Sequence, residues 1–264
     1  MKINKNLKNL LRKILPELFI QMVGKYLFGR VDEIFWIHNM FRDRKGVMID
    51  VGAHFGSSMR LFLENEWRVF AFEPSDKNRQ VLLQKYKDVD LLTIHDYGLS
   101  DICVKDVEFY ESTVSTGISS VSKFHRSHEI TQKVELKTLE SFVESENLTS
   151  IDFLKIDTEG HDLAVLKGVP WGQVRPEVIL CEYEDRKTLP LGHNVNDIAN
   201  YLVDLGYVVF VSEWHPIVEY GGNHKWRRVF KFDTSETDSS SWGNLIAIRA
   251  DLNDEYSSKI NKYW

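Results

Sequence analysis

Short apolar runs alternate along the chain with stretches in which apolar residues recur every three or four positions. Runs of about four to eight apolar residues are typical of strands buried on both faces of a parallel sheet, and the wider spacing indicates amphipathic helices. The runs cover residues 47–51, 69–74, 91–95, 153–157, 177–183, 207–211 and 244–248, with helical stretches at 59–67, 76–86, 160–167 and 195–205. This alternation predicts an α/β fold with a doubly wound, mostly parallel seven-stranded sheet.

Two regions depart from this alternation. Residues 102–147 contain Ser- and Thr-rich segments of alternating polarity, which predict an antiparallel or irregular insertion. The last two predicted strands are separated by a long stretch without a helical pattern, so we expect an antiparallel hairpin at the sheet edge. We therefore expect a main domain over 46–250, preceded by an N-terminal helical segment over 1–45 and followed by a C-terminal tail over 251–264.

The first 20 residues have a distinctive pattern. Leu and Ile recur at helical spacing between positions 7 and 18, and the charged residues from 2 to 13 are all Lys or Arg. Such a helix could make peripheral contact with a membrane surface or bind a partner, but the more common outcome is a helix that packs on its own domain. Pro16 is expected to bend or end this helix.

Composition narrows the class of protein. The 264 residues are 43% hydrophobic and 27% charged, which is ordinary for a globular protein and disfavours disorder. The net charge of -6 disfavours a nucleic-acid partner, since phosphate neutralisation needs a basic surface. Cys103 and Cys181 lie far apart in the sequence and are expected to be reduced thiols. With no run of roughly twenty apolar residues and no signal-peptide pattern, we expect a cytoplasmic protein.

A glycine-containing motif follows the first predicted strand. It reads Asp50-Val51-Gly52-Ala53-His54-Phe55-Gly56. Gly52 and Gly56 allow a tight turn that approaches a ligand closely, and the carboxyl end of a strand is where such sheets bind nucleotides. The spacing lacks the middle glycine of the dinucleotide fingerprint. Asp50 would repel a pyrophosphate but could bind the amino group of S-adenosylmethionine.

A second carboxylate lies at a matching position on the next strand. Glu73 ends that strand, 21 residues after Gly52, and Pro74 stops it. At this distance a carboxylate can bind both ribose hydroxyls of a nucleotide cofactor. For Asp50 and Glu73 the alternative is a solvated loop carboxylate. The two motifs together predict a cofactor site made of Asp50, Gly52, Ala53, His54, Phe55, Gly56, Glu73 and Pro74.

Three sequence blocks resemble the FkbM family of class I methyltransferases. The blocks are residues 49–56, 71–74 and 152–160, the last continuing through 163–168, and the Lys-Ile-Asp-x-Glu-Gly core of the third is the most specific part. The resemblance covers about residues 46–184. It implies a Rossmann-like fold, S-adenosylmethionine as cofactor and O-methylation, often of sugar or polyketide hydroxyls.

Two further points follow from the resemblance. His54 stands where the family commonly carries a small polar residue such as Asn, which affects the shape of the methionine pocket. Residues 96–100 are similar to the family's segment after the third strand, and this implies that Asp96 or Tyr97 borders the adenine.

Candidate catalytic groups cluster after the fourth and fifth predicted strands. Methyl transfer requires an enzyme to align the acceptor, take up its proton and exclude water. Asp157 ends one strand and Glu182 lies near the end of its neighbour, so the pair could hold Mg²⁺ or Mn²⁺ as oxygen ligands. Glu159 and His161 follow as further catalytic candidates.

Each of these residues also has a structural interpretation. Asp157 and Glu159 could cap the following helix, since acidic residues are favoured at a helix N-terminus. His161 could act as a general base or be a hydrogen-bonded residue at the helix start. Lys155 either points to the site or extends its stem past the sheet edge.

Aromatic residues and histidines gather in the stretch 212–241. Aromatic faces interleaved with hydrogen-bonding groups suit a sugar ring, but a lid or an ordinary surface hairpin would have the same composition. The candidate acceptor-binding residues are Trp214, His215, Tyr220, His224 and Trp226.

The sequence thus predicts an S-adenosylmethionine-dependent O-methyltransferase whose acceptor is a small molecule or glycan, namely a sugar, a glycolipid or a related natural product. Two alternatives stay open. A nicotinamide-dependent oxidoreductase is disfavoured by Asp50 and the glycine spacing. A non-catalytic Rossmann-like module would keep the fold without the chemistry.

Overall fold

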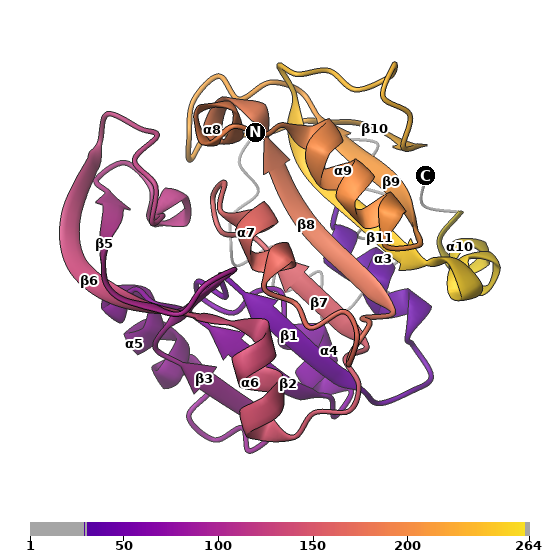
Figure 1. The fold of residues 1–264 in the computed structure, drawn as a ribbon, viewed down its shortest axis with the longest axis horizontal. Coiled ribbons are helices and arrows are strands. Elements are labelled where there is room, and N and C mark those ends of the chain that lie inside the picture. Colours follow the sequence, from indigo (N-terminus) through magenta and orange to yellow (C-terminus); the bar gives the residue numbers. More distant parts are fainter. Residues whose placement is uncertain (1–28, 30, 262–264) are drawn as a thin grey trace.

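The computed structural model describes residues 29 and 31–261, and one large sheet runs through it (Figure 1). Its order is β10-β9-β11-β8-β7-β1-β2-β3. The strands are β1 (Val47–Val51), β2 (Arg68–Phe72), β3 (Leu92–His95), β7 (Phe153–Ile156), β8 (Val178–Glu184), β9 (Tyr207–Trp214), β10 (Trp226–Lys231) and β11 (Trp242–Arg249). Strands β3, β2, β1, β7 and β8 are parallel, and β11, β9 and β10 continue the sheet antiparallel. The doubly wound, mostly parallel α/β fold is confirmed.

The predicted number of strands and the predicted edge are wrong. The sheet has eight strands rather than seven, because β10 forms inside the stretch 212–241, where we predicted no strand. The last two predicted strands do pair antiparallel, but β11 lies between β8 and β9 instead of at the edge. Residues 245–248 are fully buried on both faces, which suits an interior strand, whereas β10 is partly exposed throughout.

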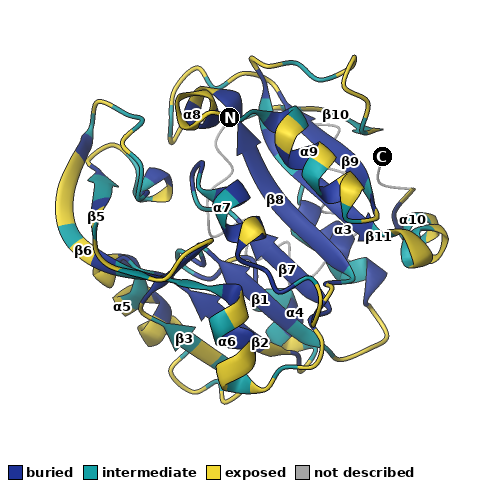
Figure 2. Ribbon diagram, viewed as in Figure 1, coloured by how far each residue is buried: buried dark blue, intermediate teal, exposed yellow. Residues whose placement is uncertain are grey.

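Helices cover both faces of the sheet because successive strand residues point to opposite sides. Met48 and Val69 pack with the helices on one face, and Ile49 and Phe70 pack with those on the other. The first face carries α3 (Glu33–Met40), α4 (Arg60–Glu64), α5 (Asp76–Lys85) and α10 (Asn253–Ile260), and the second carries α6 (Leu139–Glu146), α7 (Asp162–Lys167) and α9 (Val195–Asp204). The main strands are buried throughout the middle of the molecule (Figure 2).

A smaller sheet projects from the main one. It has the order β4-β6-β5, with β4 (Gly98–Ser100), β5 (Val104–Ser112) and β6 (His128–Thr138). Strands β5 and β6 form a long antiparallel ribbon that curves away from the main sheet, and the short helix η1 (Thr116–Ile118) lies in the connection between them (Figure 1). We call residues 104–138 the arm. It lies within the stretch 102–147 that the alternating polarity marked as an insertion.

The two ends of the described chain pack on the main domain. Helix α3 and helix α10 contact one another, and both Trp36 on α3 and Tyr256 on α10 are fully buried. The basic stretch 1–20 and its predicted membrane contact lie outside the described residues. Within residues 29 and 31–261, no helix is long and apolar enough to cross a membrane.

Candidate active site

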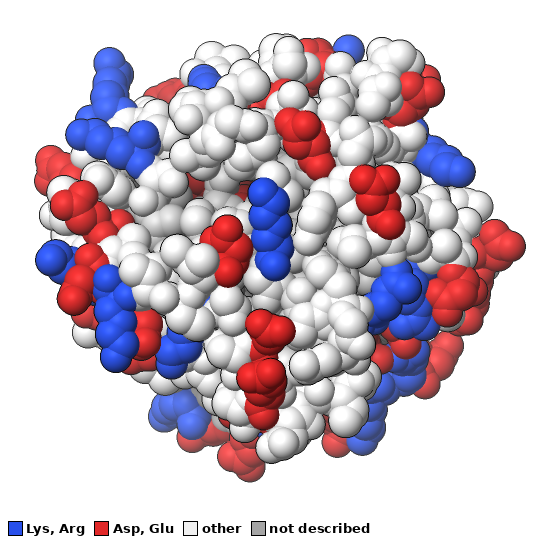
Figure 3. Space-filling view, viewed as in Figure 1, with Lys and Arg blue, Asp and Glu red and all other residues white. Residues whose placement is uncertain are grey.

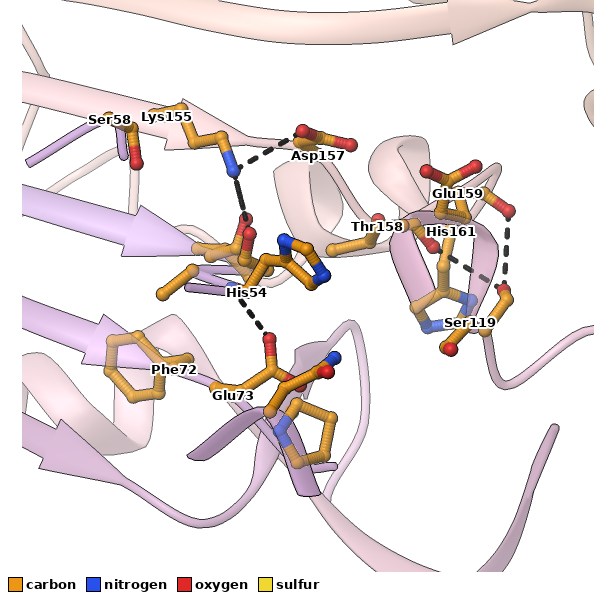
Figure 4. A pocket seen from close by; sticks show the side chains of 18 of the residues that line it. His54, Ser58, Phe72, Glu73, Ser119, Lys155, Asp157, Thr158, Glu159 and His161 are labelled. Atoms are coloured by element: carbon orange, nitrogen blue, oxygen red, sulfur yellow. Dashed lines mark hydrogen bonds and ion pairs between the residues drawn. The ribbon is translucent and has the colours of Figure 1, made fainter. Parts of the chain in front are cut away.

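A cavity of about 360 Å³ opens at the carboxyl ends of β1, β2, β7 and β8. Its place follows from the topology: β1 has β2 on one side and β7 on the other, so the connections from the two sides diverge there and leave a crevice. Figure 4 shows Glu73 after β2 and Asp157 after β7 at this cavity, which Leu180 of β8 also lines. On the molecular face in Figure 3, acidic and basic side chains are interspersed, so no field of a single sign surrounds this side.

The turn after β1 can be made only with glycine. Gly52 has φ +75, and a Cβ at this position would overlap the carbonyl oxygen of Asp157 at the end of β7. The N–H groups of Gly52 and Ala53 donate to the Phe72 carbonyl at 3.0 and 3.1 Å. The turn therefore joins the ends of three strands and forms one wall of the cavity.

Asp50 is a buried partner of Lys155 and does not line the cavity. Its side chain is fully buried, with Lys155 Nζ 3.1 Å from Oδ1 and the Ser58 hydroxyl donating to Oδ2. Direct contact between Asp50 and a cofactor amino group is therefore contradicted, because the carboxylate has no exposed oxygen. Its carboxylate instead holds Lys155 in place.

Lys155 points to the site, the first of its two interpretations. Its ammonium donates to the Gly52 carbonyl at 2.7 Å and lies 3.4 Å from Asp157 Oδ2. Burial opposes the charged form, but the carboxylates of Asp50 and Asp157 outweigh it and raise the pKa of Lys155. Lys155 thus stays cationic and joins the buried carboxylate of Asp50 to the carboxylate of Asp157, which faces the cavity. Figure 4 shows the contact between Lys155 and Asp157.

Glu73 lies at the cavity wall, where the sequence predicted it. It is 4% exposed, and its two oxygens accept from the backbone N–H groups of His54 at 2.7 Å and Ser75 at 3.0 Å. Burial raises the pKa of Glu73, and these hydrogen bonds partly offset it. Because a carboxylate has about four acceptor positions, each oxygen can still accept a hydroxyl from a ligand.

The other predicted residues of the glycine turn divide into two groups. Ala53, His54 and Pro74 line the cavity. Phe55 stacks on the His54 ring at 3.7 Å, and Gly56 packs where a Cβ would meet Leu82 and Tyr86, so neither lines it. Phe55 and Gly56 shape the turn without contacting a ligand.

The segment after β3 reaches the cavity two residues later than predicted. Asp96 is exposed, and Tyr97 packs against Phe72 at 5.4 Å between ring centroids. Neither lines the cavity, but Gly98 and Leu99 do. Asp96 and Tyr97, predicted to border the adenine, thus lie outside the cavity lining, because Asp96 faces solvent and Tyr97 packs into the core.

Asp157 is the most accessible of the predicted catalytic carboxylates. Its side chain is 41% exposed and lines the cavity, as do Glu159 and His161. Glu182 is buried behind them and does not line it. The structure nevertheless brings Asp157, Glu159 and Glu182 together, with one oxygen of each within 4.8 Å of the others. We call these three carboxylates the acidic centre.

A lysine that the sequence analysis did not identify lies in this cluster. Lys187, on α8 (Asp185–Thr188), donates to Glu159 and lies 3.1 Å from Glu182 Oε2 and 3.0 Å from Glu184 Oε2. Burial raises the pKa of Glu159 to about 7 and that of Glu182 well above its usual range, although Lys187 opposes both shifts. The only signal in the sequence is the i,i+3 spacing of Glu184 and Lys187.

Neither Asp157 nor Glu159 caps α7, because the N-cap residue is His161, which makes no side-chain cap hydrogen bond. Asp162, the first residue of α7, accepts from the N–H groups of Thr158 at 3.3 Å and Gly160 at 3.1 Å in the loop before the helix. His161 is hydrogen-bonded through Nε2 to Ser100 Oγ at 2.9 Å, and burial lowers its pKa. Asp157 is therefore free of a capping role, and His161 is a neutral, hydrogen-bonded imidazole beside the cavity.

The predicted acceptor-binding residues of the stretch 212–241 do not line the cavity. Trp214 Nε1 donates to the buried Glu33 at 2.9 Å, Trp226 packs edge-on against Trp36, and His224 packs edge-on against Trp242. His215 is exposed, and the Tyr220 hydroxyl donates to Glu184 at 2.8 Å. The prediction is wrong for the cavity because this stretch pairs into the sheet edge, which turns its tryptophans inward.

The arm supplies the wall that we had assigned to those aromatic residues. Thr116 Oγ1 lies 3.0 Å from His54 Nε2, and the Ser120 hydroxyl donates to the Glu159 carbonyl at 3.2 Å. The arm is thus fixed both to the glycine turn and to the end of β7. Its cavity-lining residues are Phe109, Thr116, Gly117, Ser119, Ser120, Val121 and Leu136. The Ser- and Thr-rich composition of 112–122 was the available signal.

Two buried polar atoms at the cavity lack hydrogen-bond partners. They are Asn78 Oδ1 and Thr158 Oγ1, and both residues line the cavity. Buried polar groups are almost always paired, so these atoms indicate a ligand that completes them. Together with Glu73 and the glycine turn, they suit a ligand that carries hydroxyl and amino groups, as S-adenosylmethionine does.

Comparison with known families identifies the chain. The family model described as Methyltransferase FkbM domain matches residues 50–209, which include the glycine turn, Glu73 and the acidic centre. The chain belongs to the FkbM methyltransferase family. It is therefore an S-adenosylmethionine-dependent methyltransferase. This assignment argues against the nicotinamide-dependent oxidoreductase that we considered as an alternative. No curated protein matches the chain significantly.

Solved structures of two methyltransferases and of TehB are similar to this chain. A precorrin-6y C5,15-methyltransferase from Geobacter metallireducens shares 14% identity over 85% of this chain and 91% of its own, with a TM-score of 0.44. The magnesium protoporphyrin IX methyltransferase from Synechocystis shares 12% identity over 94% and 86%, with a TM-score of 0.43. TehB from Haemophilus influenzae shares 8% sequence identity over 86% of this chain and 65% of its own, with a TM-score of 0.45.

We predict that Glu73→Ala weakens binding of S-adenosylhomocysteine by roughly 5- to 150-fold, or about 1–3 kcal/mol, because cofactor hydroxyls and two backbone N–H groups lose their acceptor. Calorimetric titration of the folded variant measures this. Glu64→Ala, an exposed glutamate on α4, is the control and should bind normally. Unchanged affinity in Glu73→Ala would remove Glu73 from the cofactor site.

Proposed function

We propose that this methyltransferase transfers a methyl group from S-adenosylmethionine to a hydroxyl oxygen of a sugar, a glycolipid or a related natural product. The observation that carries the proposal is the Asp157 carboxylate, which faces the cavity from the end of β7 and is held by Lys155. Such a group can align a hydroxyl and take up its proton.

The residues of the cofactor side fit the expected ligand. Bound S-adenosylmethionine supplies a methyl group on a positively charged sulfur. Glu73 is placed to accept the ribose hydroxyls, and Asn78 and Thr158 offer polar atoms that still need partners. The turn from Gly52 to His54 brings backbone close to the ligand, as its positive φ values allow.

Two groups can receive the proton of an acceptor hydroxyl. Asp157 is the nearer to open solvent and carries the proposal. His161 is the second candidate, since burial lowers its pKa and keeps the imidazole neutral at pH 7. Its Nε2 is already engaged by Ser100, which leaves it less available than Asp157. We therefore propose that Asp157 takes up the proton of the acceptor hydroxyl.

A hydroxyl-rich acceptor suits the remaining walls. Thr116, Ser119 and Ser120 from the arm and Asn244 from β11 line the cavity and can exchange hydrogen bonds with several hydroxyls at once. Because the arm is fixed at both ends of the cavity, it also limits water access to the reacting atoms. An Mg²⁺ or Mn²⁺ ion on Asp157 and Glu182 would have to share Glu182 with Lys187.

The test is an acceptor screen with the full-length protein. Sugars, glycolipid head groups and polyketide alcohols are incubated with S-adenosylmethionine, release of S-adenosylhomocysteine is followed, and the position of the new methyl is found by mass spectrometry. We expect O-methyl ethers. Products methylated only at nitrogen or carbon would contradict the proposal, and cofactor binding with no turnover on any acceptor would favour a non-catalytic module.

A further inference from the structure

The acidic centre is paired with a positively charged side chain of the protein itself, the Lys187 ammonium. Lys187 is 2% exposed, and its ammonium is surrounded by Glu159, Glu182 and Glu184. The ammonium donates hydrogen bonds to Glu159 and Glu182, and Glu184 Oε2 lies 3.0 Å from it as an ion pair. Although burial opposes the charged form, Glu159, Glu182 and Glu184 outweigh it and raise the pKa of Lys187.

The position of Lys187 is fixed by packing as well as by charge. Gly160, at φ +98, leaves room for the lysine stem, and a Cβ on Gly160 would lie 3.1 Å from Lys187 Cβ. Helix α8 is tied to the next segment, because Asp185 accepts from the Val195 N–H at 2.7 Å. These contacts fix the backbone and the start of the lysine side chain beside the acidic centre.

A divalent ion would compete with the ammonium for the same oxygens. The three carboxylates close enough to hold a metal are Asp157, Glu159 and Glu182, and Lys187 already pairs with the last two. An ion bound by Glu159 and Glu182 would leave the buried ammonium with only Glu184 as a partner, and breaking buried ion pairs costs several kcal/mol. Asp157 is the member that Lys187 does not contact at ion-pair distance.

We propose that Lys187 is the resident cation of the acidic centre, so that this methyltransferase works without a divalent metal and Asp157 alone is left to meet the acceptor. The assignment of Asp157 rests on the proposed function. Lys187 is then a positioning residue: it holds Glu159 and Glu182 in place and occupies the volume that a metal would need.

The test measures metal binding without any acceptor, so its outcome is independent of the acceptor screen. Full-length wild type and Lys187→Ala are titrated with Mn²⁺ by electron paramagnetic resonance and melted with and without Mn²⁺. We expect no stoichiometric binding by the wild type. Lys187→Ala should be less stable, bind one Mn²⁺ with a Kd of roughly 0.1–1 mM, as for weak carboxylate sites, and regain thermal stability when the ion is added.

Matched variants separate charge removal from site creation. Lys167→Ala removes an exposed lysine from α7 and should gain no Mn²⁺ affinity. If Lys187→Ala does not fold, the double variant Lys187→Ala/Glu184→Gln removes one uncompensated charge outside the acidic centre and keeps all three of its carboxylates.

Two results of the binding test would overturn the proposal. One is stoichiometric Mn²⁺ binding by the wild type that is lost in Glu182→Gln. The other is a folded Lys187→Ala, or the folded double variant, that binds Mn²⁺ no better than Lys167→Ala. Once an acceptor is known, unchanged wild-type turnover after chelation supports the proposal, and turnover restored only by Mg²⁺ or Mn²⁺ contradicts it.

Discussion

Asp157→Asn should lower methyl transfer by roughly 10²- to 10⁴-fold, the range for a general base or a positioning group, while leaving cofactor affinity unchanged. The amide keeps the size of the carboxylate and can still accept from Lys155, so the cavity wall stays in place. What it loses is the ability to take a proton from an acceptor hydroxyl. The loss should therefore appear in turnover, with little change in S-adenosylhomocysteine binding.

The measurement needs an acceptor from the screen and a matched control. Asp204→Asn makes the same chemical change at an exposed aspartate that ends α9, and it should be neutral. Near-normal turnover of Asp157→Asn on a confirmed acceptor would contradict the role, and the search for the base would move to His161. A bell-shaped pH profile that loses its acidic limb in Asp157→Asn would support the proton-transfer version.

The site residues that could be placed from the sequence are those whose positions depend only on the end of a nearby strand. Gly52 follows a buried strand directly, and Glu73 ends the next one, so their common edge follows from the parallel topology. Asp157 was found in the same way, because β7 is paired to β1 in register. For each of these residues, the end of its own strand was enough to place it.

The parts that were missed depend on contacts between distant segments. Lys187 meets Glu159 across 28 positions, and Thr116 meets His54 across 62, which no local periodicity encodes. The predicted contact of Asp50 with the cofactor was wrong for a related reason. The burial of Asp50 against Lys155, 105 positions away, depends on how β1 and β7 pair. A carboxylate in a ligand-binding turn gives the same local pattern whether it faces the ligand or a buried lysine.

The aromatic stretch shows how composition can mislead. Trp214 and Trp226 have the residue types of a sugar-binding loop, but Glu33 from the N-terminal helix accepts the Trp214 indole N–H, and Trp36 packs on Trp226. Their apolar area is used to hold the sheet edge onto α3. The arm, with few aromatic residues and many hydroxyls, reaches the cavity because it curves back from the opposite end of the sheet (Figure 1).

Gly52→Ala should combine a loss of stability with a loss of cofactor binding. An alanine at φ +75 costs roughly 1–2 kcal/mol, and its methyl group overlaps the Asp157 carbonyl, adding roughly 1–3 kcal/mol of overpacking. At roughly 2–4 °C per kcal/mol for a chain of this size, the midpoint of thermal unfolding should fall by roughly 4–20 °C. The carbonyl that must move belongs to Asp157, so turnover should fall together with affinity.

Gly192→Ala separates the two contributions. Gly192 has φ +84, close to that of Gly52, but a Cβ there meets nothing within 4 Å. The control therefore includes the backbone strain without the overlap and should cost roughly 1–2 kcal/mol, with normal binding of S-adenosylhomocysteine. Equal losses of stability in the two variants, with cofactor affinity intact in both, would show that the close approach of the glycine turn to β7 is not what shapes the cofactor site.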